Sequence, residues 1–106
     1  MGVFDLFRVP DIHQGVEEQR TVSESILLDV RSEGEYRSGH IPGSKNIPLH
    51  TLDKIRHIAQ NRSVPLYVYC RSGARSRRAA AMLQHMGYKR VKNIGGIAAW
   101  HGKVER

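Results

Sequence analysis

The chain has 106 residues and a formal charge of +7, which suits one domain and favours anionic partners. Its single cysteine excludes an intrachain disulfide and the common cysteine-pair zinc sites. No apolar run approaches the roughly 18 residues that a membrane-spanning helix needs, and Met1–Leu6 contains an early acid that does not fit a signal peptide. These features predict a cytoplasmic protein without a membrane segment, metal or cofactor.

The first half of the chain alternates short helical and extended patterns. Apolar residues at i and i+4 (Ile12 and Val16) predict a short helix over 11–20. The apolar run Ile26–Val30 predicts a buried strand. The other predictions in this half are a helix over 33–38 that ends at Gly39, a turn at 42–43, an extended segment over 46–49 and a helix over 52–60.

The second half contains the clearest strand and the clearest helix. Residues 64–69 are rich in β-branched and aromatic side chains, which predicts a strand with Pro65 near its start. A polar loop over 70–75 follows. A helix is expected over 76–86, because apolar residues recur at i, i+3, i+4 and i+7 from Ala79. Gly87 suits its C-terminal cap, and a strand over 90–94 and a short helix over 96–100 complete the chain.

Short apolar strands that alternate with helices predict an α/β fold whose parallel sheet is covered by helices on both faces. Ligands in such folds bind at the carboxyl ends of the strands. Cys70 directly follows the clearest strand. We therefore expect it at the edge of the sheet where ligands bind.

The polar loop after Cys70 combines the features of an anion site. A helix N-terminus exposes unpaired N–H groups and the positive end of the helix dipole, and Gly73 permits a tight turn that curls further amides inward. The hydroxyls of Ser72 and Ser76 can donate to the same anion or cap the helix. Because these groups favour a thiolate over a thiol, Cys70 is predicted to attack a small anion and form a covalent intermediate.

Four arginines lie close to the cysteine in the sequence: Arg71, Arg75, Arg77 and Arg78. Arg71 and Arg75 are expected to face the substrate anion or line its rim. Arg77 and Arg78 lie within the predicted helix and are expected on a solvated face. The competing interpretation of the cysteine is an inert buried thiol, and the basic, glycine-containing loop argues against it.

Four segments, in this order and spacing, resemble the single-domain rhodaneses from about Ile12 to the C-terminus. They are Leu27–Arg31, with an Asp-x-Arg signature; Glu35–Ser44 followed by Asn46–Pro48, with Gly-His-Ile-Pro-Gly and Asn-Ile-Pro blocks; Val68–Ser76, which resembles the active-site loop; and Asn93–Trp100, with a Gly-Gly…Trp block.

The resemblance implies a single rhodanese domain over residues 1–106, with a three-layer fold and a five-stranded, mainly parallel sheet flanked by helices. It implies a thiosulfate sulfurtransferase in which Cys70 is the catalytic residue and takes the outer sulfur of thiosulfate, or of a similar donor, as a persulfide. The sulfur would then pass to cyanide, a thiol or an acceptor protein. The substrate-binding residues would be those whose backbone amides cradle the persulfide: Arg71, Ser72, Gly73, Ala74, Arg75 and Ser76.

Thiosulfate is preferred over mercaptopyruvate as the donor, because a dianion gains more from two flanking arginines. The resemblance also implies mainly structural roles for Asp29 and His40. The other histidines show no metal-ligand spacing. Trp100 is expected in the core.

Three alternatives stay open. A small-oxyanion phosphatase or arsenate reductase of the related type has five residues between its cysteine and arginine, whereas four residues separate Cys70 from Arg75. A non-catalytic sulfur carrier or binding module is a second alternative, although family members with such roles lack the cysteine. Nucleic-acid binding is the third, and it is not expected because the aromatic residues do not interleave with the basic ones.

Overall fold

The computed structural model describes residues 10–106. Met1–Leu6, which the sequence predicts not to be a signal peptide, lies outside the described residues. Helices and strands alternate along the described chain. In order, they are α1 (Ile12–Thr21), β1 (Ile26–Asp29), α2 (Glu33–Ser38), β2 (Lys45–Asn46), the 3-10 helix η2 (Leu49–Lys54), α3 (Ile55–Ile58), β3 (Leu66–Cys70), α4 (Ala74–His85), β4 (Val91–Gly96) and the 3-10 helix η3 (Ile97–Ala99). Within this range, no helix has the length and apolar character to cross a bilayer.

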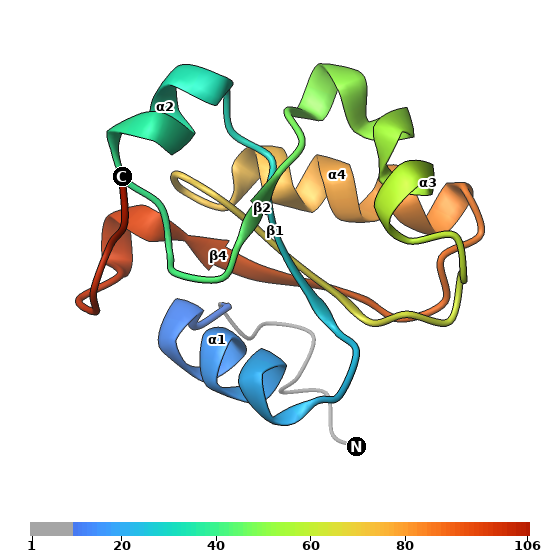
Figure 1. Cartoon of the computed structure of the whole chain (residues 1–106), viewed down its shortest axis with the longest axis horizontal. Helices are drawn as coiled ribbons and strands as arrows, with labels where there is room; N and C mark the ends of the chain where they lie inside the picture. Colours follow the sequence, from blue (N-terminus) through green and yellow to red (C-terminus); the bar gives the residue numbers. More distant parts are fainter. Residues whose placement is uncertain (1–9) are drawn as a thin grey trace.

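The four strands form one parallel sheet in the order β2-β1-β3-β4. α1 covers one face of this sheet, and α3 and α4 lie on the other side (Figure 1). The predicted three-layer α/β fold is therefore confirmed. The described residues supply four strands where five were predicted. A further extended contact pairs His40 with Glu105 as an isolated antiparallel bridge, which Pro42 cannot extend because it has no N–H.

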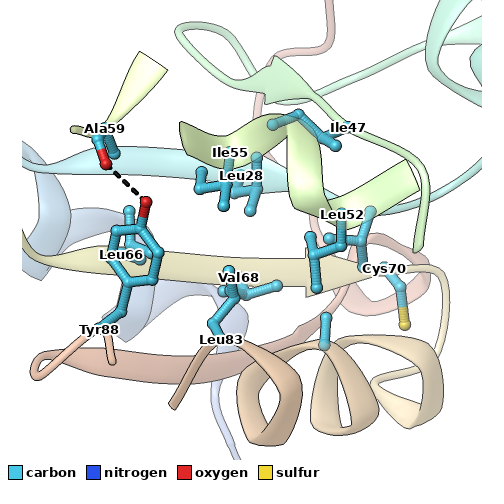
Figure 2. Packing of buried hydrophobic residues seen from close by; sticks show 12 residues of the cluster. Leu28, Ile47, Leu52, Ile55, Ala59, Leu66, Val68, Cys70, Leu83 and Tyr88 are labelled. Carbon is cyan, nitrogen blue, oxygen red and sulfur yellow. Dashed lines mark hydrogen bonds between the residues drawn. The ribbon is translucent and has the colours of Figure 1, made fainter. Parts of the chain in front are cut away.

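Alternating residues of β3 divide the core between the two faces of the sheet. Leu66, Val68 and Cys70 pack into the larger cluster, together with residues of β1, η2, α3 and α4 (Figure 2). Tyr67 and Tyr69 point to the smaller cluster beneath α1. β3 is buried along its whole length, as expected for the central strand of a covered parallel sheet.

The segment predicted as one helix over 52–60 is instead the end of η2 joined to the single-turn α3. Thr51 has non-helical backbone angles (φ −122°, ψ 30°). The Ala59 carbonyl, which a longer helix would use internally, accepts the Tyr88 hydroxyl at 2.6 Å (Figure 2). Leu52, Ile55 and Ala59 are buried, but Ile58 is 41% exposed. The apolar pattern therefore identified most of the buried face but not the length of the helix.

Two other predictions concern the ends of elements. The extended segment predicted over 46–49 shortens to β2, because Pro48 has no N–H for a ladder and Leu49 already belongs to η2. At the end of α4, Gly87 adopts a left-handed conformation (φ 100°), and the Tyr88 N–H donates to the Leu83 carbonyl. This is the glycine-dependent C-terminal cap that the sequence predicts.

Trp100 was expected in the core and is only partly buried. Its ring stacks on that of His13 with 5.0 Å between centroids, and its indole N–H donates to the Lys103 carbonyl at 3.0 Å. The indole covers the smaller cluster from outside, because its polar edge finds its partner near the surface.

Candidate active site

Cys70 ends β3 at the carboxyl edge of the sheet, and the chain enters α4 after only three more residues. The helix begins at Ala74, two residues before the predicted start at Ser76. Gly73 is its N-cap residue, with a left-handed backbone (φ 100°) and no side-chain cap, so neither Ser72 nor Ser76 caps the helix. The turn brings the N-terminus of α4 back onto the cysteine.

The sulfur of Cys70 is enclosed by polar groups of its own loop. The Gly73 N–H donates to Sγ at 3.0 Å, and the Ser76 hydroxyl lies 3.5 Å from Sγ. Cys70 is 1% exposed and belongs to the larger apolar cluster. Its sulfur, however, is directed toward the start of α4 and away from Leu28 (Figure 2). The thiol is therefore buried beneath hydrogen-bond donors.

Two opposing effects act on the ionisation of the Cys70 thiol. Burial raises its pKa, and hydrogen bonds to the thiolate lower it; the donors are the Ser76 hydroxyl and then the backbone N–H groups of Ser76, Gly73 and Ser72. The hydrogen bonds together prevail, so the pKa lies below that of an ordinary thiol. N–H groups in the first turn of an α-helix have no internal partner, which leaves them available to the sulfur.

The arginines near the cysteine have different surroundings. The Arg75 guanidinium makes two hydrogen bonds to the Glu35 carboxylate of α2, at 2.7 and 2.9 Å. Those bonds hold the pKa of Glu35 at about 2, and they raise the pKa of Arg75. Arg71, Arg77 and Arg78 are exposed. Arg75, predicted to face the substrate anion or line its rim, thus carries a charge that Glu35 already balances.

The end of β4 packs against residues 70–76, the sulfur loop. A Cβ atom added at Gly96 would collide with the Arg71 carbonyl, and that carbonyl accepts the Ala98 N–H at 3.0 Å. β4 carries a bulge here, because Val68 of β3 pairs with Asn93 while its neighbour pairs with Gly95. The Gly-Gly block of the sequence, Gly95 and Gly96, therefore allows close contact between two backbones.

Sequence reasoning missed Asn93 as a part of this site. Its side-chain Oδ1 lies 2.7 Å from the Ser76 hydroxyl and accepts the Gly95 N–H at 3.0 Å. The available signal was its position two residues before a glycine that closes a turn, which suits an asparagine side chain that bonds its own backbone.

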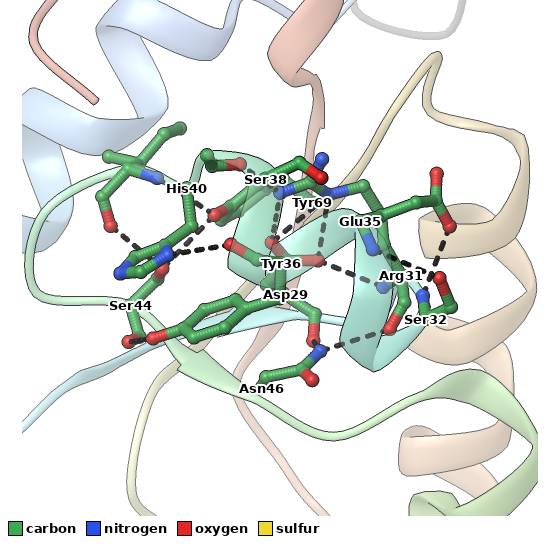
Figure 3. A network of polar contacts seen from close by, with 12 residues as sticks. Asp29, Arg31, Ser32, Glu35, Tyr36, Ser38, His40, Ser44, Asn46 and Tyr69 are labelled. Atoms are coloured by element: carbon green, nitrogen blue, oxygen red, sulfur yellow. Dashed lines mark hydrogen bonds and ion pairs between the residues drawn. The ribbon is translucent and has the colours of Figure 1, made fainter. Parts of the chain in front are cut away.

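A polar network at the end of β1 holds the neighbouring loops (Figure 3). The Asp29 carboxylate accepts the Arg31 backbone N–H at 2.9 Å and pairs with the Arg31 guanidinium at 2.7 Å. The same guanidinium donates to the Gly39 carbonyl, and the Asn46 side chain donates to the carbonyls of Asp29 and Arg31. These contacts agree with the structural role that the resemblance implied for Asp29.

His40 also makes contacts that hold the fold. Its ring stacks on Tyr36 with 3.7 Å between centroids, and its Nδ1 lies 2.9 Å from the Tyr36 carbonyl. Its backbone pairs with Glu105 near the C-terminus. Across residues 10–106, no group of three or more histidine, cysteine or acidic side chains is placed to hold a metal ion.

Two hollows border the sulfur loop. One has a volume of about 430 Å³ and lies between the end of β1, η2 and α4, with Val30, Leu49, Arg75 and Met82 in its wall. The other, of about 580 Å³, is lined by Ser72, Gly73, Asn93 and Gly96 among others. Cys70 itself lines neither hollow, because it is only 1% exposed.

The chain matches the model of the family described as "Rhodanese-like domain" over residues 10–103. A protein named "Sulfurtransferase" from Allochromatium vinosum is 43% identical over 81 residues, which cover 73% of this chain and 74% of that protein. The "Putative sulfur carrier protein YrkF" of Bacillus subtilis is 38% identical over 100 residues, which cover 92% of this chain and 54% of YrkF. The chain thus spans about half the length of YrkF.

A solved structure has a similar fold. The "rhodanese with anions from E. coli" superposes with a TM-score of 0.72 and 30% sequence identity. The superposition covers 77% of this chain and 98% of that one.

Proposed function

This chain belongs to the rhodanese-like domain family, and on that premise we propose that it is a sulfurtransferase whose Cys70 carries sulfur as a persulfide. One observation supports the proposal most: the Cys70 sulfur accepts the Gly73 N–H at 3.0 Å, with the Ser76 hydroxyl 3.5 Å away. Thiolate is the reactive form of cysteine, and such donors stabilise it.

The reaction has two half-steps. The Cys70 thiolate attacks the outer sulfur of thiosulfate, a new S–S bond forms, and the S–S bond of thiosulfate breaks with its electron pair leaving on sulfite. In the second step a thiolate, cyanide or a nucleophile on an acceptor protein attacks the outer sulfur of the persulfide. Cys70 then leaves as a thiolate, and neither half-step consumes an oxidant or a reductant.

Thiosulfate is the donor we propose, ahead of mercaptopyruvate. It is a dianion, and the loop offers it backbone donors at the start of α4 together with the exposed guanidinium of Arg71. The net charge of +7 draws small anions to the whole surface.

The setting of the reaction follows from its chemistry. We propose that residues 1–106 act as one rhodanese domain without a cofactor, in the cytoplasm, where a single catalytic thiol stays reduced. The positive surface suits an acidic acceptor protein. The residues that we assign to the substrate are those of the loop: Arg71, Ser72, Gly73, Ala74, Arg75 and Ser76.

Mass spectrometry of the intact protein after treatment with thiosulfate tests this function. We expect a mass gain of one sulfur atom that is absent from the Cys70→Ser variant and is lost on addition of cyanide. Steady-state assays with a panel of sulfur donors then rank thiosulfate against mercaptopyruvate. An unchanged mass with every donor refutes the enzyme and favours a binding module, and turnover of an aryl phosphate alone favours the oxyanion phosphatase.

A further inference from the structure

The Ser76 hydroxyl lies within reach of one sulfur and three oxygens. Its Oγ is 3.5 Å from the Cys70 sulfur and 2.7 Å from Asn93 Oδ1, and it is 3.1 Å and 3.4 Å from the carbonyl oxygens of Gly73 and Gly95. Ser76 is fully buried, so bulk water does not compete. Because a hydroxyl has one proton, Ser76 donates to only one of these acceptors at a time.

Asn93 provides the nearest of the four acceptors, and its carboxamide is held in one orientation. The Gly95 N–H donates to Oδ1 at 3.0 Å, while Nδ2 faces the Gly73 carbonyl at 3.4 Å. A flipped amide would set its NH₂ group against the Gly95 N–H. Oδ1 is therefore the atom that faces Ser76.

The preferred partner of the hydroxyl depends on the charge of the sulfur. Beside a neutral thiol, the hydroxyl donates to Asn93, and the S–H can donate to a lone pair of Ser76 Oγ. Beside a thiolate, the hydroxyl gains more by donating to the sulfur, since hydrogen bonds to ions are roughly twice as strong as neutral ones. Asn93 Oδ1 keeps the Gly95 N–H in both arrangements, so neither leaves it without a donor.

We propose that Asn93 is a positioning residue that acts on Cys70 through Ser76, holding the hydroxyl while the sulfur is neutral and releasing it to the thiolate. Its part in turnover rests on the proposed function. When the thiolate attacks a donor, the new S–S bond removes the charge from Sγ, and the hydroxyl turns back to Asn93. When the persulfide is cleaved, the thiolate returns and the hydroxyl follows; Ser76 and Asn93 neither gain nor lose a proton.

The charged groups on the elements around the sulfur are paired or exposed. Asp29 of β1 is bonded by Arg31 at 2.7 Å, and Glu35 of α2 by Arg75 at 2.7 Å. β4 borders the loop with uncharged residues. The remaining charged or titratable groups on the loop, the first turns of α4 and η2 are exposed to solvent: Arg71, Arg77, Arg78, His50, Asp53 and Lys54.

Alkylation of the reduced, full-length protein by iodoacetamide tests the proposal without any sulfur donor. The rate followed against pH reports the Cys70 thiolate, because thiolate is the nucleophile. Ser76→Ala removes the donor and should raise the midpoint of the profile by about one pH unit. Ser76→Thr keeps a hydroxyl and is the matched control, and its midpoint should stay closer to the wild-type value than that of Ser76→Ala.

Asn93→Leu keeps the approximate shape of the side chain and removes the competing acceptor. It should lower the midpoint when Ser76 is present and leave it unchanged in the Ser76→Ala background, where no hydroxyl remains to compete for. If the midpoint rises in Asn93→Leu, or shifts equally in both backgrounds, the positioning role of Asn93 is overturned.

A second variant covers the case in which Asn93→Leu does not fold, as judged by circular dichroism. Asn93→Asp keeps an acceptor for the Gly95 N–H and binds the hydroxyl more strongly, so it should raise the midpoint more with Ser76 present than in the Ser76→Ala background. Equal shifts overturn the proposal. If the midpoints shift as predicted but the protein gains no sulfur from any donor, the positioning role of Asn93 is supported and the proposed function is refuted.

Discussion

Glu35 and Arg75 join the first turns of two helices through a two-point ion pair, with N–O distances of 2.7 and 2.9 Å. The Glu35 carboxylate also accepts the Ser32 N–H in the capping box of α2. One side chain therefore fixes both the start of α2 and the start of α4, where the sulfur loop ends. The Glu35 carboxylate also balances the positive charge of Arg75.

Glu35→Gln should release the charge of Arg75 and so improve the use of thiosulfate. Glutamine can still accept the Ser32 N–H, which preserves the cap, but it no longer balances the guanidinium. We expect KM for thiosulfate to fall severalfold, and the protein to be somewhat less stable to urea. Glu33→Gln is the matched control, because Glu33 makes only an exposed pair with Arg37 at 3.8 Å. An unchanged KM in the Glu35 variant would show that Arg75 does not act on the donor.

The same carboxylate should make the fold sensitive to acid. The pKa of Glu35 is about 2 in the folded protein, against about 4.3 in an unfolded chain. Its contribution to stability is therefore complete above the unfolded value and is lost as the pH falls toward the folded one. Urea unfolding between these pH values should show a weaker dependence on pH for Glu35→Gln than for Glu33→Gln. Parallel curves for the two variants would contradict this assignment.

Arg71 is the exposed cation next to the cysteine, and we expect it to act on charged donors alone. Arg71→Ala should lower kcat/KM for thiosulfate about threefold to fivefold, since an exposed pairing contributes up to about 1 kcal/mol. Its rate with a neutral persulfide donor should not change. Arg77→Ala removes another exposed arginine that lies within α4 and should have a smaller effect. Equal losses with both donors would show that Arg71 supports the loop instead of the anion.

Local patterns predicted the parts of this site that depend on neighbours in sequence. The apolar run that ends at Cys70, the glycine-containing turn and the following helix are all within a few residues of one another, so their order was enough to place the sulfur. The partner of Arg75 lies 40 residues away, and that of Ser76 lies 17 residues away. Those pairs depend on how α2 meets α4 and on the bulge in β4, which no local pattern reports.

Gly96→Ala should damage the sulfur loop. A Cβ at this position would collide with the Arg71 carbonyl, and backbone cannot move aside as a flexible side chain can. We expect a loss of stability of about 1–3 kcal/mol and a larger fall in the rate of persulfide formation, because the loop amides would shift away from the sulfur. Gly34→Ala is the control, since an added Cβ there meets no atom within 4 Å. If the two variants form persulfide equally fast, close contact between β4 and the loop is not needed for the reaction.

The ionisation of Cys70 should also appear in the stability of the fold. Its pKa is lowered in the folded protein, whereas an unfolded chain binds the thiol proton up to about pH 8.5. Between the two values the unfolded state holds more protons, so the free energy of unfolding should rise with pH, and the gain should be lost as the pH falls through the folded pKa. Cys70→Ser should remove this rise in urea titrations under reducing conditions. A wild-type curve that is flat over this range, or that falls with pH in a Cys70-dependent way, would mean that burial outweighs the loop donors and that the folded protein favours the thiol.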